Sequence, residues 1–227
     1  MPVFQLTESL LFPPPELAEA DGLLAVGGDL SPERLLMAYR AGIFPWYSPG
    51  DPILWWSPDP RLVLFPDEFY LSKRLARTIR QKVFEVTFDT AFKEVIANCA
   101  NLRNRTGEGT WIDEAMQEAY CRLHELGFAH SVECRQDGKL VGGLYGVAIG
   151  SIFFGESMFS LTSNSSKVAM ATLVAYLKKK NFDLIDCQIG TPHLKSLGAR
   201  DISGDQFSQL LAEAVNKPTP REPWQLP

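Results

Sequence analysis

The segment Phe182-Asp-Leu-Ile-Asp-Cys-Gln-Ile189 decides how this chain folds, because it is an apolar strand with polar side chains at its centre. It follows a helical stretch, 166–180. A strand that follows a helix is expected inside a sheet that is covered on both faces. With a period of two, Asp186 and Gln188 share one face with Leu184. A buried carboxylate is costly unless it is hydrogen-bonded, so the strand indicates either local backbone capping or a polar cleft.

A second strand, 151–159, repeats this pattern. Its segment Gly155-Glu-Ser-Met-Phe159 puts Glu156 and Met158 on one face of an otherwise apolar strand. A solvated strand end would explain the acid equally well. Two polar strand centres in one chain nevertheless favour a lined cleft.

Helices and strands mix over the rest of the chain. Strands are expected at 61–65, 83–88, 131–135 and 139–148, and the dipeptide Asp137-Gly138 predicts a hairpin between the last two. Further helices are expected near 31–42, 71–80, 113–127 and 205–215. In the helix near 71–80, Leu71, Leu75 and Ile79 form the expected buried stripe. The pattern predicts an α+β protein.

The domain organisation follows from a change in composition near Asp59. The first part is rich in Pro, Gly and Trp and holds one clear helix, which Ser31 can cap and Gly42 can end. We expect a small N-terminal α/β domain over residues 1–59 and a larger mixed-sheet domain over 60–227.

The cysteines and the apolar stretches exclude several classes of protein. Four cysteines stand far apart without a C-x-x-C pair, so neither a metal site nor a disulfide framework is expected. No secretory leader is recognisable, and the most apolar stretch, 140–154, is broken by glycines and falls short of the ~18 residues of a membrane span. A soluble, cytoplasmic protein is expected, without a membrane partner and as a monomer.

Charge is distributed unevenly along the chain. The formal net charge of −5 does not favour a nucleic-acid-binding protein as such. Between Leu71 and Phe84, however, five cations occur without an acid. An ordinary solvated helix face is the alternative to a polyanion-binding surface. The five residues are Lys73, Arg74, Arg77, Arg80 and Lys82.

The tryptophans Trp46 and Trp111 stand in segments dense with turn residues. A Trp in such a loop usually packs against the protein. The alternative is a surface on which a base stacks, which is worth ~1–3 kcal/mol per base.

Seven blocks occur in unchanged order between Pro13 and Ala199: Gly22-Leu-Leu-Ala-Val-Gly-Gly-Asp-Leu30, Gly42-Ile-Phe-Pro-Trp-Tyr-Ser-Pro-Gly50, Trp55-Trp-Ser-Pro-Asp-Pro-Arg61, Gly109-Thr-Trp-Ile112, Gly155-Glu-Ser-Met-Phe-Ser160, Ile185-Asp-Cys-Gln188, and His193 with Ser196-Leu-Gly-Ala199. In these blocks the chain resembles the leucyl/phenylalanyl-tRNA–protein transferases. The resemblance implies a C-terminal acetyltransferase-like domain of the GNAT type. It also implies transfer of Leu or Phe, and Met less well, from Leu-tRNA or Phe-tRNA to acceptor proteins that begin with Arg or Lys. Such transfer marks those proteins for the N-degron pathway and needs no cofactor.

The resemblance also assigns residues. Asp186 and Gln188 match the catalytic pair, and the cations of 73–82 match a tRNA-binding helix by general position. The implied substrate-binding residues hold the terminal adenosine (Trp46 and Trp111), form a polar wall (Glu156) or line the amino-acid pocket (Leu144, Phe153, Met158, Met170 and Leu173).

Three rival functions remain open. An acetyl-CoA-dependent enzyme would need a glycine-containing loop for pyrophosphate, and the stretch Leu161-Thr-Ser-Asn-Ser-Ser-Lys167 has no glycine. A non-catalytic tRNA-binding module would use the same cations and tryptophans. A peptidoglycan-type aminoacyltransferase would differ in its acceptor, a cell-wall lysine.

Overall fold

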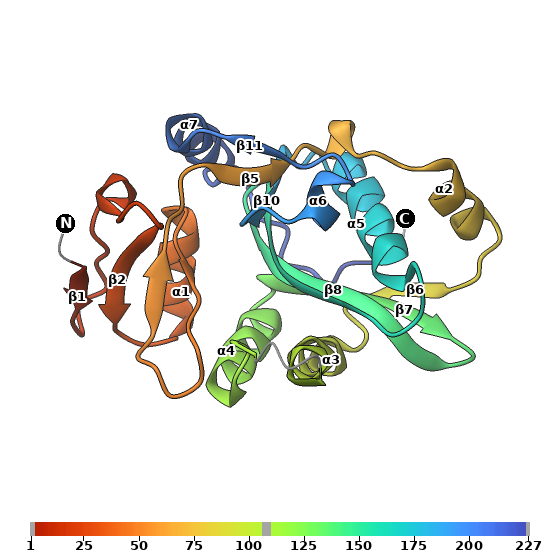
Figure 1. Ribbon diagram of the computed structural model, residues 1–227, viewed down its shortest axis with the longest axis horizontal. Helices are drawn as coiled ribbons and strands as arrows, with labels where there is room; N and C mark the ends of the chain where they lie inside the picture. The colour runs from red at the N-terminus through yellow and green to blue at the C-terminus, as the bar shows by residue number, and fades with distance from the viewer. Residues whose placement is uncertain (1–2, 106–109, 226–227) are drawn as a thin grey trace.

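The computed structural model describes residues 3–105 and 110–225, and it contains a small and a large sheet (Figure 1). The block that begins at Gly109 therefore lies partly outside the described residues. The small sheet has the strand order β1-β2-β4-β3 and the large sheet β11-β5-β10-β9-β8-β7-β6. A mixed α+β architecture with a small N-terminal part and a larger sheet after it confirms the predicted fold class.

The small sheet is built from β1 (Phe4–Leu6), β2 (Leu23–Gly27), β3 (Phe44–Pro45) and β4 (Leu54–Trp56). Its helix, α1 (Pro32–Arg40), begins as expected, because the Ser31 side chain accepts a hydrogen bond from the Arg34 N–H. Gly42 has a φ of 74° after the helix, which confirms the predicted stop.

The large sheet contains seven strands whose bounds are β5 (Arg61–Leu64), β6 (Glu85–Phe88), β7 (Ala129–Gln136), β8 (Lys139–Ile149), β9 (Ile152–Ser160), β10 (Leu184–Gln188) and β11 (Arg200–Ile202). The central pair, β9 and β10, is parallel, and the other neighbours are antiparallel. The predicted hairpin is confirmed between β7 and β8, where Asp137 and Gly138 both have positive φ.

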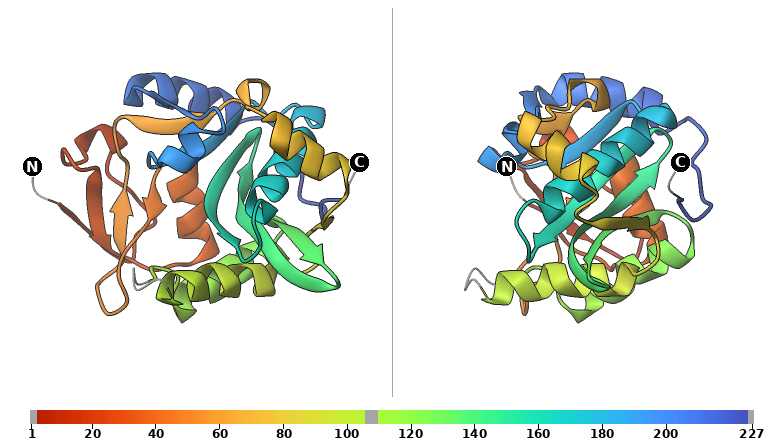
Figure 2. Two further views of the ribbon diagram at one scale, coloured as in Figure 1. Left: turned by 45° about the vertical axis from the view of Figure 1, so that its right-hand side comes forward. Right: turned by 90° about the vertical axis from the view of Figure 1, so that its right-hand side faces the viewer.

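Helices cover both faces of the large sheet. On one face lie α3 (Phe92–Arg105) and α4 (Glu114–Glu125), and on the other lie α5 (Ser165–Lys179) and α2 (Lys73–Arg80) (Figures 1 and 2). The short helix α6 (Pro192–Lys195) and the helix α7 (Gly204–Ala214) follow β10 and β11. The 3₁₀ turns η1 (Pro15–Leu17) and η2 (Pro66–Glu68) complete the elements.

The structure differs from the sequence-based expectations in several details. Helix α3 was not predicted. The expected buried stripe of α2 is wrong at Leu71, which precedes the helix and is 46% exposed, whereas Leu75 is buried. The helix begins only after Ser72, whose side chain accepts a hydrogen bond from the Leu75 N–H, so Leu71 has no helical face to join.

The C-terminal segment returns to the core after α7. Trp224 is buried, stacks on the His130 ring at 3.9 Å between centroids, and its backbone N–H donates to Asp89. None of the four cysteines, all of which lie in the described part of the chain, forms a disulfide. None of the helices within 3–105 and 110–225 has the length and apolar character needed to cross a membrane.

Candidate functional site

The two strands at the centre of the large sheet separate partway along their length. The β9–β10 ladder pairs Leu184 with Ile152 and reaches Asp186 opposite Phe154. Beyond that point Glu156 and Gln188 face each other across the opening, and the Gln188 Nε2 donates to Glu156 Oε1 over 3.0 Å. The site therefore lies where a parallel strand pair opens.

A β-bulge shapes each side of this opening. The β8–β9 register shifts between Tyr145 and Gly146, next to Glu156. The result is that Glu156 bonds to residues on the α3–α4 side, whereas Met158 packs in the cluster on the α5 side. The prediction that Glu156 and Met158 share a face is therefore wrong, because a bulge resets the alternation of a strand.

The second bulge lies in β10. Its register against β5 shifts between Asp186 and Gln188, so that Gln188 pairs with Leu62, and Gln188 has a left-handed φ of 61°. Leu62 belongs to the core cluster on the α5 side, together with Ile185. The bulge and the left-handed φ interrupt the regular alternation from which a shared face of Asp186 and Gln188 was predicted, and the two side chains have different partners, Arg61 for Asp186 and Glu156 for Gln188.

Asp186 is completely buried and forms an ion pair with Arg61. The Arg61 Nε donates to Asp186 Oδ1 over 2.9 Å and its Nη2 donates to Oδ2 over 2.7 Å. The guanidinium lies between the rings of Phe44 and Phe207, at 4.9 and 4.6 Å from their centroids. Asp186 Oδ1 also accepts the backbone N–H of Gln188 over 2.9 Å. The carboxylate thus fixes the backbone that presents Gln188.

Glu156 is held by three donors. Tyr39 Oη donates to its Oε1 over 2.7 Å and Tyr120 Oη to its Oε2 over 2.9 Å, in addition to the Gln188 amide. Burial, with a smaller contribution from the nearby Asp186 carboxylate, raises the pKa of Glu156 to about 7 against the lowering effect of these hydrogen bonds. Burial and Glu156 together raise the pKa values of Tyr39 and Tyr120 well above the usual value. Both tyrosines therefore stay protonated donors.

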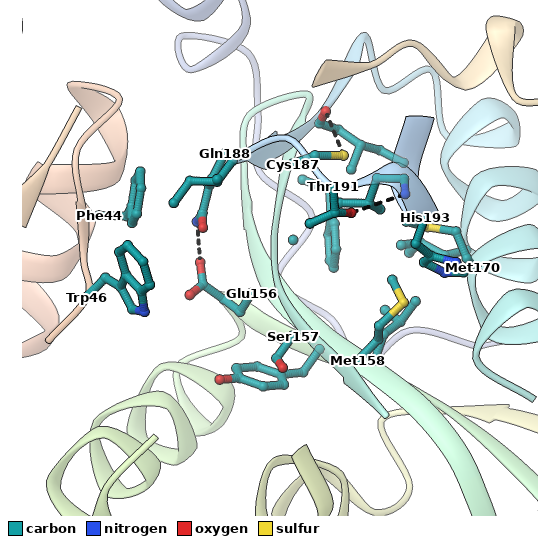
Figure 3. Close-up of a pocket in the computed structure, with 18 of the residues that line it drawn as sticks. Phe44, Trp46, Glu156, Ser157, Met158, Met170, Cys187, Gln188, Thr191 and His193 are labelled. Carbon is teal, nitrogen blue, oxygen red and sulfur yellow. Dashed lines mark hydrogen bonds between the residues drawn. The ribbon is translucent and has the colours of Figure 1, made fainter. Parts of the chain in front are cut away.

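A cavity of about 330 Å³ opens beside the Glu156–Gln188 hydrogen bond. Figure 3 shows Phe44 and Trp46 on one side of this bond and Met158, Met170 and His193 on the other. Two aromatic rings thus lie on one side of the polar pair, and two methionine side chains and His193 lie on the other. The lining includes all eight predicted substrate-binding residues: Trp46, Trp111, Leu144, Phe153, Glu156, Met158, Met170 and Leu173.

Only one residue of the predicted catalytic pair lines this cavity. Gln188 lines it, whereas Asp186 is absent from the described lining and contacts Gln188 from behind. The predicted tRNA-binding residues lie elsewhere, since Lys73, Arg74, Arg77, Arg80 and Lys82 are on or next to α2. Helix α2 lies at the end of the molecule opposite the small sheet (Figures 1 and 2).

Sequence reasoning missed three residues of the polar cluster. Tyr39 and Tyr120 fit the apolar stripes of their helices, a pattern that indicates core packing and no polar role. The sequence did give a signal for Arg61. A cation next to an apolar strand and an acid inside another apolar strand each require a buried partner, so the two could have been paired.

Two family models match the chain. The model described as "Leucyl/phenylalanyl-tRNA protein transferase" matches residues 63–212, and the model of the N-terminal domain of the same family matches residues 28–59. Among solved structures, a GCN5-related N-acetyltransferase from Kribbella flavida aligns with a TM-score of 0.37 and 16% identity, over 76% of this chain and 61% of that one.

Curated relatives match along nearly the whole chain. A protein from Desulfatibacillum aliphaticivorans named leucyl/phenylalanyl-tRNA–protein transferase is 60% identical over 100% of this chain and 97% of its own length. A protein of the same name from Syntrophobacter fumaroxidans is 59% identical over 99% of this chain and 96% of its own. The chain belongs to the leucyl/phenylalanyl-tRNA–protein transferase family.

Proposed function

We propose that the protein transfers Leu or Phe, and Met less well, from aminoacyl-tRNA to the N-terminal Arg or Lys of acceptor proteins. The observation that carries the proposal is the Glu156–Gln188 hydrogen bond, which lies between an aromatic and an apolar part of one cavity. An adenosine stacked near Trp46 and Trp111 and an aminoacyl side chain among Met158 and Met170 would bring the connecting ester close to Gln188.

The reaction depends mainly on the orientation of the attacking amine relative to the ester. The ester is already activated, and the attacking α-amine has a pKa of ~7.7–8.0, so roughly one molecule in ten is neutral at pH 7. Positioning can supply ~7–11 kcal/mol, far more than the cost of that deprotonation. The Nε2 of Gln188 is committed to Glu156, which leaves its Oε1 to accept a hydrogen bond from the amine. In this proposal, Asp186 positions Gln188 through the backbone N–H and does not touch the substrate.

The apolar part of the cavity would select the aminoacyl group. Leu144, Phe153 and Leu173 are buried, and the flexible side chains of Met158 and Met170 adapt to Leu or Phe. A Val or Ile side chain branches next to its Cα, and such steric discrimination is worth ~1–3 kcal/mol.

For the rest of the tRNA, we propose that the cations of 73–82 bind its phosphates. The proposed boundary between the domains lies between residues 59 and 60, and it is supported by β4 ending at Trp56 in one sheet and β5 beginning at Arg61 in the other. A cytoplasmic monomer that marks its products for the N-degron pathway completes the proposal.

The test mixes the protein with Leu-tRNA and three peptides that differ only in their first residue, Arg, Lys or Ala. Mass spectrometry should find one added leucine on the first two peptides. Retention of Leu-tRNA without any product would favour the non-catalytic binding module. Incorporation of label from radioactive acetyl-CoA would favour the acetyltransferase, and addition to the side chain of an internal lysine would favour the peptidoglycan-type enzyme.

A further inference from the structure

A carboxylate outside the polar cluster lies next to the cavity and is occupied by a lysine of the same chain. Asp201 on β11 accepts the Lys195 ammonium of α6, with 2.5 Å between Nζ and Oδ2. Both side chains are partly exposed, Asp201 at 39% and Lys195 at 50%. The structural role of this pair is small, because exposed ion pairs contribute little to stability.

The sheet register relates Asp201 to Gln188. Leu62 of β5 pairs with Gln188 on one side and with Asp201 on the other. Asp201 and Gln188 therefore stand level with each other on either side of β5. Two strand spacings separate their Cα atoms by roughly 10 Å. That distance suits an acceptor residue whose α-amine lies at Gln188 and whose side chain extends about 6 Å, as the four-carbon stem of lysine does.

The chain between Gln188 and α6 borders the cavity and passes beside Asp201. Gly190 stands between Ile189 and Thr191, which both line the cavity. A Cβ at Gly190 would lie 3.6 Å from Asp201 Oδ1 and 3.5 Å from Lys195 Cε. The carboxylate thus lies directly beside an exposed stretch of the cavity rim, which has no side chain at Gly190.

The other carboxylate near the site suits a cation less well. Glu156 is 9% exposed and already accepts hydrogen bonds from Tyr39, Tyr120 and Gln188. A guanidinium that reached Glu156 would lose its hydration and would have to displace those donors. Asp201 is accessible to water, and its described partner is itself an ammonium group.

We propose that Asp201 binds the cationic side chain of the acceptor's N-terminal Arg or Lys, and that Lys195 occupies this subsite until an acceptor displaces it. The inference rests on the proposed function and names the residue that selects its acceptor. Lys195 acts as an internal competitor, so the two residues have opposite effects on acceptor affinity.

The experiment measures steady-state kinetics with Leu-tRNA and two peptides, one beginning with Arg and one with citrulline, its neutral isostere. Asp201→Asn should raise the KM for the Arg peptide about fivefold, as expected for a partly exposed ion pair. The KM for Leu-tRNA and the rate with the citrulline peptide should not change. Lys195→Met should lower the KM for the Arg peptide by a few-fold. Asp137→Asn, at the exposed tip of the β7–β8 hairpin, is the control for net charge.

The outcomes separate this inference from the proposed function. If the wild type adds leucine to the Arg peptide but Asp201→Asn still distinguishes Arg from citrulline as the wild type does, the subsite is refuted. A raised KM of the Lys195→Met enzyme for the Arg peptide would also refute the subsite. This second test does not depend on whether the Asp201 variant folds. A wild type that adds leucine to neither peptide refutes the proposed function itself.

Discussion

Two buried carboxylates lie close together in this protein, and they differ in the partners that surround them. Asp186 has a bidentate guanidinium partner in Arg61, which compensates its charge directly. Glu156 has only neutral donors, two phenols and an amide, and burial dominates its ionisation. The first carboxylate is suited to a fixed structural position, and the second can change its charge near neutral pH.

This difference predicts a pH dependence of stability. The pKa of Glu156 is raised in the folded protein from 4.5 to about 7, so the folded state binds more protons than the unfolded state between these values. The contribution of Glu156 to the free energy of unfolding is therefore complete at low pH and is lost as the pH rises towards 7, by up to about 3 kcal/mol.

Chemical denaturation of the wild type and Glu156→Gln between pH 4.5 and 8 measures this contribution. The wild type should lose stability relative to the variant as the pH rises, and any constant offset from altered hydrogen bonds leaves that slope unchanged. Glu222→Gln, at an exposed position, is the matched control. Parallel curves for the wild type and Glu156→Gln would contradict the raised pKa.

The Arg61–Asp186 pair predicts a separation of stability from turnover. Asp186→Asn leaves the buried guanidinium of Arg61 without its counter-ion, so the free energy of unfolding should fall by about 3–5 kcal/mol. Its kcat should fall by ~10²–10⁴ while charged tRNA still binds. The double variant Arg61→Met/Asp186→Leu should recover most of the stability, because apolar replacement of a buried pair is often neutral.

Turnover of that double variant decides the role of Asp186. It should stay low, since the backbone N–H of Gln188 no longer has its acceptor. Denaturant titration and single-turnover transfer of leucine measure the two quantities on the same samples. Recovery of kcat together with stability would assign Asp186 a purely structural role.

Local sequence patterns could predict only part of this site. The polar residues of β9 and β10 were visible as interruptions of apolar strands, and the family blocks supplied Trp46 and Trp111. The bulges next to Glu156 and Gln188 were not visible, because the backbone register depends on the partner strand. The Tyr39 and Tyr120 contacts join helices that are distant in sequence, and an amphipathic pattern treats both tyrosines as core.

At the scale of elements, capping and turn chemistry were predicted well and long-range packing was not. Ser31, Gly42 and the Asp137-Gly138 turn act within a few residues of their position, so their roles can be read locally. Leu71 was wrongly assigned to the helix, because the apolar spacing begins at Leu71 whereas the helix begins only at Lys73. Helix α2 buries Leu75 alone, and its proposed role in tRNA binding rests on its cations and its general position in the chain.

Charge reversal in α2 tests this role. Arg77→Glu with Arg80→Glu should weaken Leu-tRNA binding and reduce the steepness of its salt dependence by about 0.7 for each phosphate that the variant no longer binds. The KM for acceptor peptides should not change, since α2 lies away from the cavity. Lys93→Glu with Lys139→Glu, two exposed cations outside α2, is the control. Equal affinity and an equal salt slope in the α2 variant would refute the interface.

At the scale of the whole molecule, the two sheets share one core. A single cluster of buried residues contains Leu24, Leu35 and Trp55 from the small sheet and its helix, and Tyr120 and Phe154 from the large part. The Tyr39–Glu156 hydrogen bond joins the same two parts at the cavity. The site therefore depends on both parts being folded and in contact.

This shared core predicts that the protein unfolds in one transition, although it contains two sheets. Separation of the parts would expose Leu35, Trp55 and Tyr120 to water, and burying a large apolar side chain is worth about 1.5–3 kcal/mol. Native-state hydrogen exchange should therefore give similar opening free energies for the amides of β2 and β4 and for those of β8 and β9. The calorimetric and van't Hoff enthalpies of unfolding should also agree. A β2–β4 sheet that exchanges at a clearly lower free energy than β8–β9 would show that the small part opens by itself, and the cavity would then be assembled by domain closure instead of being present in the folded protein at all times.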